Sequence, residues 1–331
     1  MTGSLIKTGG NSIQFNKHFI EHFLEIKKRN SEYTSISYER DIKDFFNIEV
    51  IAEITLEDII NVNIFDVEAY MLELHNRDKS SATINRKISA LSSLYKWLLK
   101  YQDNRTGVSI IKYNPFGSLK DEKPKVNNKE TEFLTLEESK RLIDSIDDRT
   151  VLGMRNKAIL SLAITTALRK SEIINIKFKD IKKIHGYDVI EVIRKGNKKD
   201  IVKIQTNVLN LITTYINNTN RSFDNNENEY LFIGHSRNGK NKEKLDPSTL
   251  NYMIKKCCER AGINKKIKVH STRHTAITLA ITSGASIEKV RDFAAHKNIA
   301  TTNRYVHSID KLKDNAGDLI DLLIRYLEPL E

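Results

Sequence analysis

Six residues of this chain have side chains that together could cleave a phosphodiester without a metal ion. In chain order these residues are Arg169, Lys195, His270, Arg273, His296 and Tyr305. The arginines and histidines could surround one phosphate and neutralise the charge of a five-coordinate transition state. Lys195 could then act as the acid and Tyr305 as the nucleophile, whose attack on phosphorus leaves a covalent phosphotyrosine. The set as a whole therefore predicts phosphoryl transfer.

Arg169 follows an apolar segment and is itself followed, three residues later, by Glu172 in the string ALRKSEI. An arginine at the end of a helix is commonly just a surface residue, because cations are favourable there. A carboxylate three residues further on favours another interpretation, since it can hold the guanidinium in one pose. A guanidinium held in this way can bind phosphate in a bidentate manner that lysine cannot imitate.

The string HSTRH places His270, Arg273 and His274 at positions i, i+3 and i+4, so on a helix they share one face. Two histidines at this spacing are also typical of zinc peptidases, which place a glutamate directly after the first histidine. This chain has Ser271 and Thr272 in the interval, and Arg273 on the same face opposes a divalent cation. The face suits a phosphate better, and we expect neither a metal nor another cofactor.

The other three residues are less distinctive when each is taken alone. Lys195 stands in the string RKGNKK, where a solvated turn is the simpler interpretation and where Lys198 or Lys199 could replace it. His296 precedes Tyr305 by nine residues. Tyr305 lies in the polar string TTNRYVH, which makes it a poor core residue, and its phenol, with an ordinary pKa near 10, needs nearby cations to attack.

The composition is that of a two-domain globular protein with a polyanionic partner. The chain has 331 residues, 39% hydrophobic and 29% charged, and a formal net charge of +11. Because phosphate contacts release counterions, this charge favours a nucleic acid or an anionic membrane surface without distinguishing them. No run of about 18 apolar residues is present, and the first residues lack the apolar core of a signal peptide. We therefore expect a cytoplasmic protein that does not enter a membrane.

The first part of the chain has the apolar periodicity of helices. Apolar residues recur every three or four positions between residues 19 and 45, and Thr55 with Asp58 predicts the start of a further helix. The clearest helix follows Ser80, with the apolar stripe Ile84, Ile88, Leu91, Tyr95 and Leu98. Its opposite face is either solvated or in contact with a phosphate backbone. That face carries Asn85, Arg86, Lys87, Ser89, Ser92 and Ser93.

A break in the periodicity predicts two domains. Residues 114–132 contain two of the four prolines and no apolar stripe, which indicates a linker. It would follow a first domain over residues 15–113, itself preceded by a flexible tail of residues 1–14. A second domain would occupy residues 133–331.

The second domain begins with a predicted capping box at Thr135 and Glu138, which starts a helix that extends to about residue 146. Residues 155–168 are apolar nearly all round, which predicts a buried central helix. Residues 188–194 and 200–204 alternate like strands on either side of Gly196 and Asn197, and so predict a small hairpin with Lys195 at its turn.

The strings ALRKSEI, RKGNKK, HSTRH and AAHKNIATTNRYVH, in this order, resemble the catalytic signature of the tyrosine recombinases, which include phage and transposon integrases and Xer-type resolvases. The helix SATINRKISALSSLYKWL is similar to one in their core-binding domain. The resemblance implies a mainly α fold, with a helical SAM-like core-binding domain and a mostly helical catalytic domain that contains a small antiparallel sheet. One departure is Ala294-Ala295 before His296, where the family usually has Leu-Gly.

The resemblance also implies residue roles. Arg169, His270, Arg273 and His296 would bind the scissile phosphate, Lys195 would protonate the leaving 5′ oxygen and Tyr305 would attack. Glu172 and His274 would support them. DNA contacts are expected from Asn85, Arg86, Lys87, Lys198 and Lys199.

The implied function is site-specific recombination through a 3′-phosphotyrosyl intermediate, without metal or ATP. The DNA partners would be double-stranded core sites, and the protein would form a homo-tetramer on two of them. Accessory proteins would set the direction of recombination. The protein would be cytoplasmic and associated with the nucleoid. An apolar face over residues 314–331 predicts a terminal helix that either folds back or is exchanged between subunits. The alternatives are DNA relaxation by a type IB topoisomerase-like enzyme and a non-catalytic DNA-binding regulator of the same fold.

Overall fold

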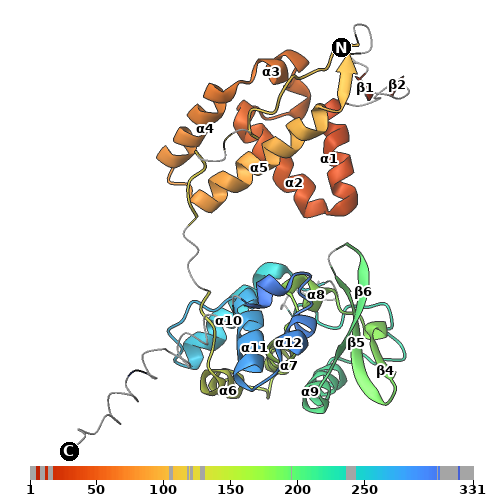
Figure 1. Cartoon of the computed structure of the whole chain (residues 1–331). Helices are drawn as coiled ribbons and strands as arrows, with labels where there is room; N and C mark the ends of the chain where they lie inside the picture. The colour runs from red at the N-terminus through yellow and green to blue at the C-terminus, as the bar shows by residue number, and fades with distance from the viewer. Residues whose placement is uncertain are drawn as a thin grey trace, which may run out of the picture. The chain divides into compact units, whose positions relative to one another are not determined.

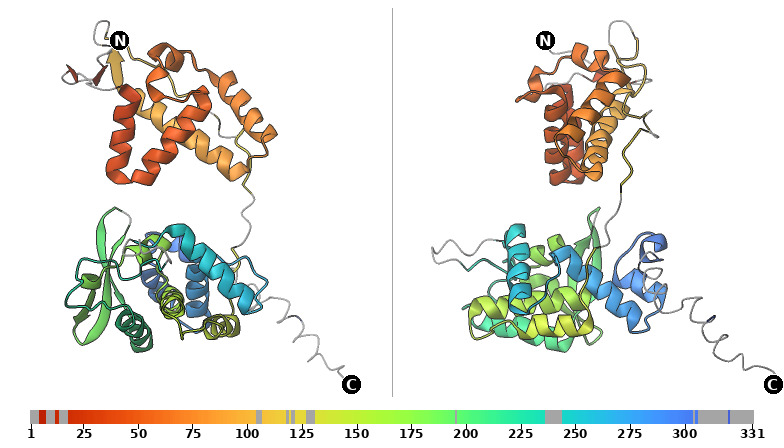
Figure 2. Two further views of the ribbon diagram at one scale, coloured as in Figure 1. Left: turned by 180° about the vertical axis from the view of Figure 1, so that it is seen from behind. Right: turned by 90° about the vertical axis from the view of Figure 1, so that its left-hand side faces the viewer.

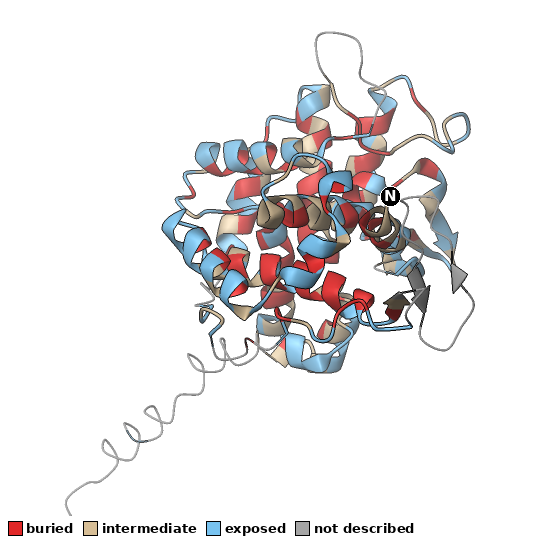
Figure 3. Cartoon of the chain, turned by 90° about the horizontal axis from the view of Figure 1, so that it is seen from above, coloured by how far each residue is buried: buried red, intermediate tan, exposed pale blue. Residues whose placement is uncertain are grey.

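The computed structural model describes residues 5–7, 12–13, 18–103, 107–117, 119, 122–126, 131–194, 196–235, 244–303, 305 and 320. The chain divides into two compact units, Met1–Lys129 and Glu130–Glu331 (Figure 1). Each unit has its own apolar core. Buried residues lie on the inner faces of the helices and exposed residues on their outer faces (Figure 3).

The N-terminal unit is helical, as the sequence predicts. Its helices are α1 (Phe19–Asn30), α2 (Glu32–Phe46), the 3-10 helix η1 (Ile51–Glu53), α3 (Leu56–Asn61), α4 (Ile64–Asn76) and α5 (Ser81–Leu98). The capping box of Thr55 and Asp58 begins α3, and the Ser80 hydroxyl accepts from the Thr83 amide at the start of α5. All five residues of the predicted α5 stripe are buried, so this helix forms the centre of the unit.

Three short strands complete this unit and correct one prediction. β1 (Leu5–Lys7) pairs antiparallel with β2 (Ser12–Ile13) and with β3 (Tyr101–Asp103), in the order β2-β1-β3. Residues 5–7 and 12–13 are therefore not part of a flexible tail. Strands of two or three residues are too short for periodicity to reveal, and one of the two partners of β1, strand β3, lies far along the chain at Tyr101–Asp103.

The start of the predicted linker also belongs to the N-terminal unit. Phe116 and Leu119 are fully buried in its core, and the Phe116 ring lies 5.1 Å from that of Phe45. Asn114 holds this segment in place, because its Nδ2 atom donates to the carbonyl oxygen of Ser92 at 3.1 Å. Residues 114–117 and 119 thus belong to the packed N-terminal unit rather than to a free connection.

The second unit is mostly helical with a small sheet. Its helices are α6 (Leu136–Asp144), α7 (Val151–Thr166), α8 (Lys170–Asn175), η2 (Phe178–Asp180), α9 (Thr206–Asn217), α10 (Pro247–Arg260), α11 (Val269–Thr282) and α12 (Ile287–Phe293). The predicted capping box of Thr135 and Glu138 starts α6. The predicted central helix is α7, which packs against both α9 and α11. The fold class predicted from the sequence is confirmed.

The sheet lies beside the helices of this unit (Figures 1 and 2). It consists of β4 (Ile181–Ile184), β5 (Tyr187–Arg194) and β6 (Lys198–Lys203), antiparallel and in that order. The predicted hairpin is formed by β5 and β6, whereas β4 was not predicted. Gly196 and Asn197, with φ of +86° and +59°, make the turn after β5, which is why residues that tolerate the left-handed region stand there.

Candidate active site

Arg169 and Glu172 form the interaction that the sequence predicts. Arg169 is the residue that precedes α8, and its backbone amide donates to Glu172 Oε2 at 2.7 Å. Its Nη1 atom donates to Glu172 Oε1 at 2.9 Å. Glu172 is 6% exposed, whereas the Arg169 side chain is 40% exposed. The buried carboxylate thus orients a guanidinium that still faces solvent.

Arg273, on α11, is only 3% exposed. Its Nη1 atom donates to the carbonyl oxygen of Ala167 at 2.5 Å, and its Nη2 atom donates to that of Ala294. Ala167 and Ala294 follow the last residues of α7 and α12, where unpaired carbonyl groups carry partial negative charge. Burial and the nearby Arg169 lower the pKa of Arg273 to about 10, which leaves it protonated at neutral pH.

Two histidines of α11 lie beside the tyrosine. His270 Nε2 and His274 Nε2 are 3.1 Å apart, and His274 Nε2 is 3.4 Å from the Tyr305 hydroxyl oxygen. Burial lowers the pKa of both histidines, to about 4 for His274. Both imidazoles are therefore neutral at pH 7, so each has one ring nitrogen that accepts hydrogen bonds. The sequence analysis gave His274 a supporting role; its position is directly next to the Tyr305 hydroxyl.

His296 also lies beside Tyr305, with the two rings stacked and their centroids 6.1 Å apart. Its Nδ1 atom is 3.0 Å from the hydroxyl of Thr302, which is fully buried. Burial lowers the pKa of His296 to about 4. The preceding Ala295 has a φ of +46°, so this chain makes the left-handed turn before His296 with alanine, at a cost that glycine avoids.

Tyr305 is half-buried. Its ring packs against a small apolar cluster that includes Ala167, Ile277 and Ala294. Burial raises the pKa of its phenol, and the positive charge of Arg273 opposes this rise. The phenol is therefore neutral at pH 7, and cations near its oxygen would stabilise the phenolate as it forms.

Lys195 lies outside the described residues, but its neighbours do not. Arg194 at the end of β5 donates to Glu172 Oε2 at 2.7 Å and to Asp200 Oδ2 at 2.9 Å. The sequence analysis did not single out Arg194. Lys198 begins β6 and is exposed, and Lys199 pairs with Glu191 at 2.9 Å.

Residues 132–311 match the phage integrase family, and residues 17–102 match the N-terminal SAM-like domain of phage integrases. The chain belongs to the phage integrase family. It is 30% identical to the tyrosine recombinase XerC of Anoxybacillus flavithermus over 301 residues, which cover 89% of this chain and 94% of the relative. It is also 30% identical to the tyrosine recombinase XerD of Oceanobacillus iheyensis over 297 residues, covering 88% and 94%. The resemblance inferred from the sequence is confirmed: this is a tyrosine recombinase, an enzyme that cleaves and rejoins DNA.

Solved structures share the fold. The pre-cleavage complex of the XerH recombinase with its difH substrate aligns with a TM-score of 0.65 at 18% identity, over 89% of this chain and 83% of that one. The Tn1549 transposon integrase in complex with circular intermediate DNA aligns with a TM-score of 0.61 at 16% identity, over 85% and 92%.

The polar face of α5 in the recombinase is less open than the sequence predicts. Arg86 Nη2 donates to Asp41 Oδ1 at 2.9 Å, and Asp41 is fully buried. Lys87 is 7% exposed, and its ammonium donates to Asp44 Oδ2 at 2.7 Å. The expectation that Lys87 lies on an exposed face is therefore wrong. Its ammonium group is buried because it pairs with Asp41 and Asp44 of α2. Asn85 donates to the carbonyl oxygen of Pro124 at 3.0 Å.

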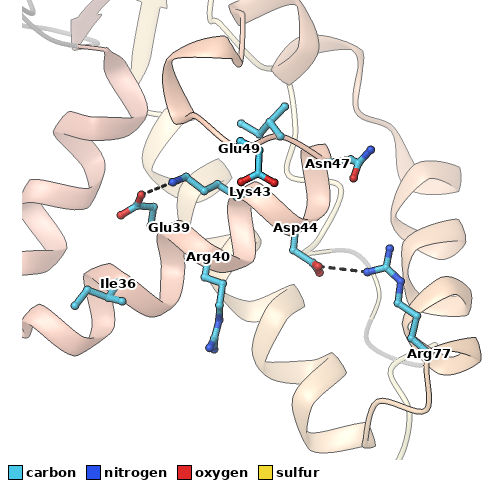
Figure 4. A pocket seen from close by; sticks show the side chains of 9 residues that line it. Ile36, Glu39, Arg40, Lys43, Asp44, Asn47, Glu49 and Arg77 are labelled. Carbon is cyan, nitrogen blue, oxygen red and sulfur yellow. Dashed lines mark hydrogen bonds and ion pairs between the residues drawn. The ribbon is translucent and has the colours of Figure 1, made fainter.

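A hollow in the N-terminal unit does not involve the predicted catalytic residues. It is lined by Ile36, Glu39, Arg40, Lys43, Asp44, Asn47, Ile48, Glu49 and Arg77 (Figure 4). Acidic and basic side chains that line it form ion pairs, Glu39 with Lys43 on α2 at 2.7 Å and Asp44 with Arg77 at 3.3 Å. These charges neutralise each other, so the hollow has no evident preference for a charged ligand.

The described residues of the recombinase contain neither a membrane-spanning helix nor a cluster of metal-ligating side chains. Within these residues, no helix is long and apolar enough to cross a membrane. The same part of the chain contains no group of three or more histidine, cysteine, aspartate or glutamate side chains arranged to hold a metal ion.

Proposed function

We propose that this recombinase exchanges DNA strands at specific sites through a covalent 3′-phosphotyrosyl intermediate at Tyr305. The observation that carries the proposal is the convergence on one phenol of groups from separate segments. His274 contacts the Tyr305 hydroxyl, His296 stacks on its ring, and Arg273 acts electrostatically on it. Arg169 is close enough to Arg273 to lower its pKa. Such a collection of cations and neutral imidazoles suits a phosphodiester.

In the first step, the Tyr305 oxygen attacks phosphorus and the bond from phosphorus to the 5′ oxygen breaks. Arg169 and Arg273 neutralise the non-bridging oxygens, and His270 and His296 donate hydrogen bonds to them. The phenol proton passes to a neutral imidazole or to water, and Lys195 protonates the leaving 5′ oxygen. Glu172 keeps Arg169 oriented throughout, and His274 supports the phenol.

The second step reverses the first with a different nucleophile. A 5′-hydroxyl from the partner duplex attacks the phosphotyrosine and releases Tyr305. Because the phosphotyrosyl bond conserves the energy of the original phosphodiester, the reaction requires no ATP. Arg169 and Arg273 would take the place of a metal ion in neutralising the phosphate. Four such transfers, one for each strand, complete recombination of two double-stranded core sites.

DNA contacts outside the active site would come from both units. In the N-terminal unit we assign them to Asn85 and Arg86 on α5, and we leave out the buried Lys87. In the hairpin we assign them to Lys198 and Lys199, which are exposed. The net charge of +11 supports a polyanionic partner of this kind.

Assembly would involve a homo-tetramer on two core sites, with accessory proteins that set the direction of exchange. The predicted terminal helix, whose apolar residues include Leu319, Leu323 and Leu327, would bind a neighbouring subunit. This segment lies outside the described residues, apart from Ile320. Truncation after Lys311 should leave single-site binding intact and abolish paired-site complexes. Normal recombination by the truncated protein would mean that the helix packs on its own subunit.

The decisive experiment is a nicked suicide substrate, from which the cleaved strand diffuses away before religation. Covalent protein–DNA complexes should accumulate in excess EDTA and should disappear when Tyr305 is replaced by phenylalanine. Loss of cleavage that zinc or magnesium restores would contradict the metal-free mechanism. Failure to trap any complex would favour a non-catalytic regulator. Relaxation of plasmids that lack a specific site, without exchange between duplexes, would favour a type IB topoisomerase-like enzyme.

A further inference from the structure

We infer that Arg194 is a positioning residue that holds Lys195 at the scissile phosphate, because it connects the turn end of the hairpin to Glu172, the carboxylate that also binds Arg169. The inference rests on the proposed function, because it presupposes that Lys195 is the general acid. It adds a residue outside the six that the sequence singled out.

The contacts of Arg194 join three elements. Its Nη1 atom donates to Glu172 Oε2 on α8 at 2.7 Å, and its Nε atom donates to Asp200 Oδ2 on β6 at 2.9 Å. Arg194 itself ends β5. The Arg194 side chain is 10% exposed and that of Glu172 is 4% exposed, so solvent screens this ion pair less than it would screen a pair on the surface, whereas Asp200 is 42% exposed. A single guanidinium thus connects both strands of the hairpin to the helix that carries the phosphate-binding arginine.

The strand register explains how one side chain reaches both partners. Arg194 lies opposite Lys198 in the ladder, and Asp200 is two residues beyond that position on β6. Residues two apart on a strand share a face, so Arg194 and Asp200 are diagonal neighbours within reach of a long side chain. The pair therefore closes the hairpin at the last rung before its turn.

Glu172 is shared between two arginines. Its Oε1 atom binds the Arg169 side chain, while its Oε2 atom binds the Arg169 amide and Arg194. The same carboxylate therefore sets the pose of the Arg169 guanidinium and fixes the hairpin. Because Lys195 directly follows Arg194, movement of this end of the hairpin would displace the proposed acid from the phosphate that Arg169 would bind.

Lysine at position 194 would not reproduce this arrangement. The guanidinium presents Nε and Nη1 in a fixed fork, which matches two carboxylates in different directions, whereas an ammonium is a single point charge. Arg194→Lys therefore keeps the charge and loses one of the two connections. Arg194→Gln loses the charge as well.

The test compares two DNA substrates in single-turnover cleavage by the full-length protein. One has the ordinary phosphodiester, and the other has sulfur in place of the bridging 5′ oxygen. A thiol, with a pKa near 8.5, leaves without protonation, whereas a hydroxyl with a pKa of about 15 needs the acid. A residue that acts through Lys195 should matter only for the oxygen substrate.

We expect Arg194→Lys and Arg194→Gln to slow cleavage of the ordinary substrate by about 10²-fold, the usual effect of a small displacement of a catalytic group. The sulfur substrate should restore the rate to within about threefold of the unsubstituted protein. Lys195→Ala should behave in the same way. Asp200→Asn, which removes only the connection to β6, should give a smaller loss that sulfur also restores. DNA affinity should stay unchanged in all of these variants.

Lys182→Gln is the matched control, since it removes an ion pair with Glu191 on the same sheet at 2.9 Å and should leave both rates unchanged. Equal slowing of both substrates by the Arg194 variants would overturn the inference, because it would indicate an effect on phosphate binding or folding. Rescue of the Arg194 variants without rescue of Lys195→Ala would overturn the assignment to Lys195. Absence of any covalent complex with the unsubstituted protein would instead contradict the proposed function.

Discussion

The Nε2 atom of His274 lies 3.4 Å from the hydroxyl oxygen of Tyr305. Burial lowers the pKa of His274 to about 4 and raises the pKa of Tyr305, so both groups are neutral at pH 7. A neutral imidazole can accept the phenol hydrogen bond and thereby orient the hydroxyl. His270 Nε2 lies 3.1 Å from the same nitrogen of His274, so the phenol and His270 share this atom as a hydrogen-bonding partner. Two neutral imidazoles, those of His274 and His296, thus contact the tyrosine, and the side chain of the nearby Arg169 is 40% exposed.

The Tyr305→Phe variant should bind its DNA site normally and form no covalent complex. The ring keeps its packing against the small apolar cluster around Ala167, and only the hydroxyl is lost. Binding is measured by electrophoretic mobility shift, and the covalent product on a denaturing gel. DNA-linked protein with this variant would show that another tyrosine is the nucleophile.

Arg169→Ala and Arg273→Ala should each slow cleavage by about 10²-fold or more, the scale for loss of one preorganised transition-state contact. Their effects on stability should differ. Arg169 is 40% exposed, whereas loss of the buried Arg273 leaves the carbonyl groups of Ala167 and Ala294 without its donors. Arg273→Ala should therefore lower the free energy of unfolding by about 2 kcal/mol. Equal urea midpoints for the two variants would contradict this account.

Ala295→Gly should stabilise the protein by up to about 1 kcal/mol, because glycine adopts a φ of +46° without the steric cost that alanine has. Ala294→Gly is the matched comparison. Ala294 is fully buried and has a φ of −80°, so glycine there loses a packed methyl group and should destabilise by about 1 kcal/mol. Thermal unfolding of both variants would test the pair, and a lower Tm for Ala295→Gly would contradict the strain argument.

The second unit should lose stability as the pH falls from about 6.5 towards 4. Burial lowers the pKa of His235, His274 and His296 to about 4, whereas in the unfolded chain each has its ordinary value near 6.5. Between these values the unfolded chain binds more protons than the folded chain, so stability rises with pH across this interval and is fully present above it.

Urea unfolding followed by circular dichroism at pH 7 and pH 5 would measure this change. Trp97, the one tryptophan of the chain, belongs to the N-terminal core and reports on that unit by fluorescence. His235→Asn should reduce the difference between the two pH values, because one of the three shifted groups is gone. Equal midpoints at pH 7 and pH 5 would show that these histidines do not titrate differently on folding.

The sequence by itself determined the elements whose signals are local. Thr55 with Asp58 and Thr135 with Glu138 are capping boxes because each pair needs only three residues of spacing, and Glu172 orients Arg169 at the same spacing. The α5 stripe and the turn at Gly196 also follow from neighbouring residues. Such signals depend on backbone geometry within a few residues, which any helix or hairpin reproduces.

Only the tertiary structure decided which distant groups meet. Lys87 is buried because Asp44, 43 residues away, neutralises it, and Arg273 binds the carbonyl of Ala167 across 106 residues of sequence. The role of Arg194 was likewise hidden, since it depends on Glu172 in another element and on the strand register with Asp200. From the sequence alone, a charged residue is expected to be solvated unless its partner is known. A partner that folding brings close leaves no periodic pattern in the sequence. The physical reason is that burial of a charge depends on the opposite charge that folding places beside it.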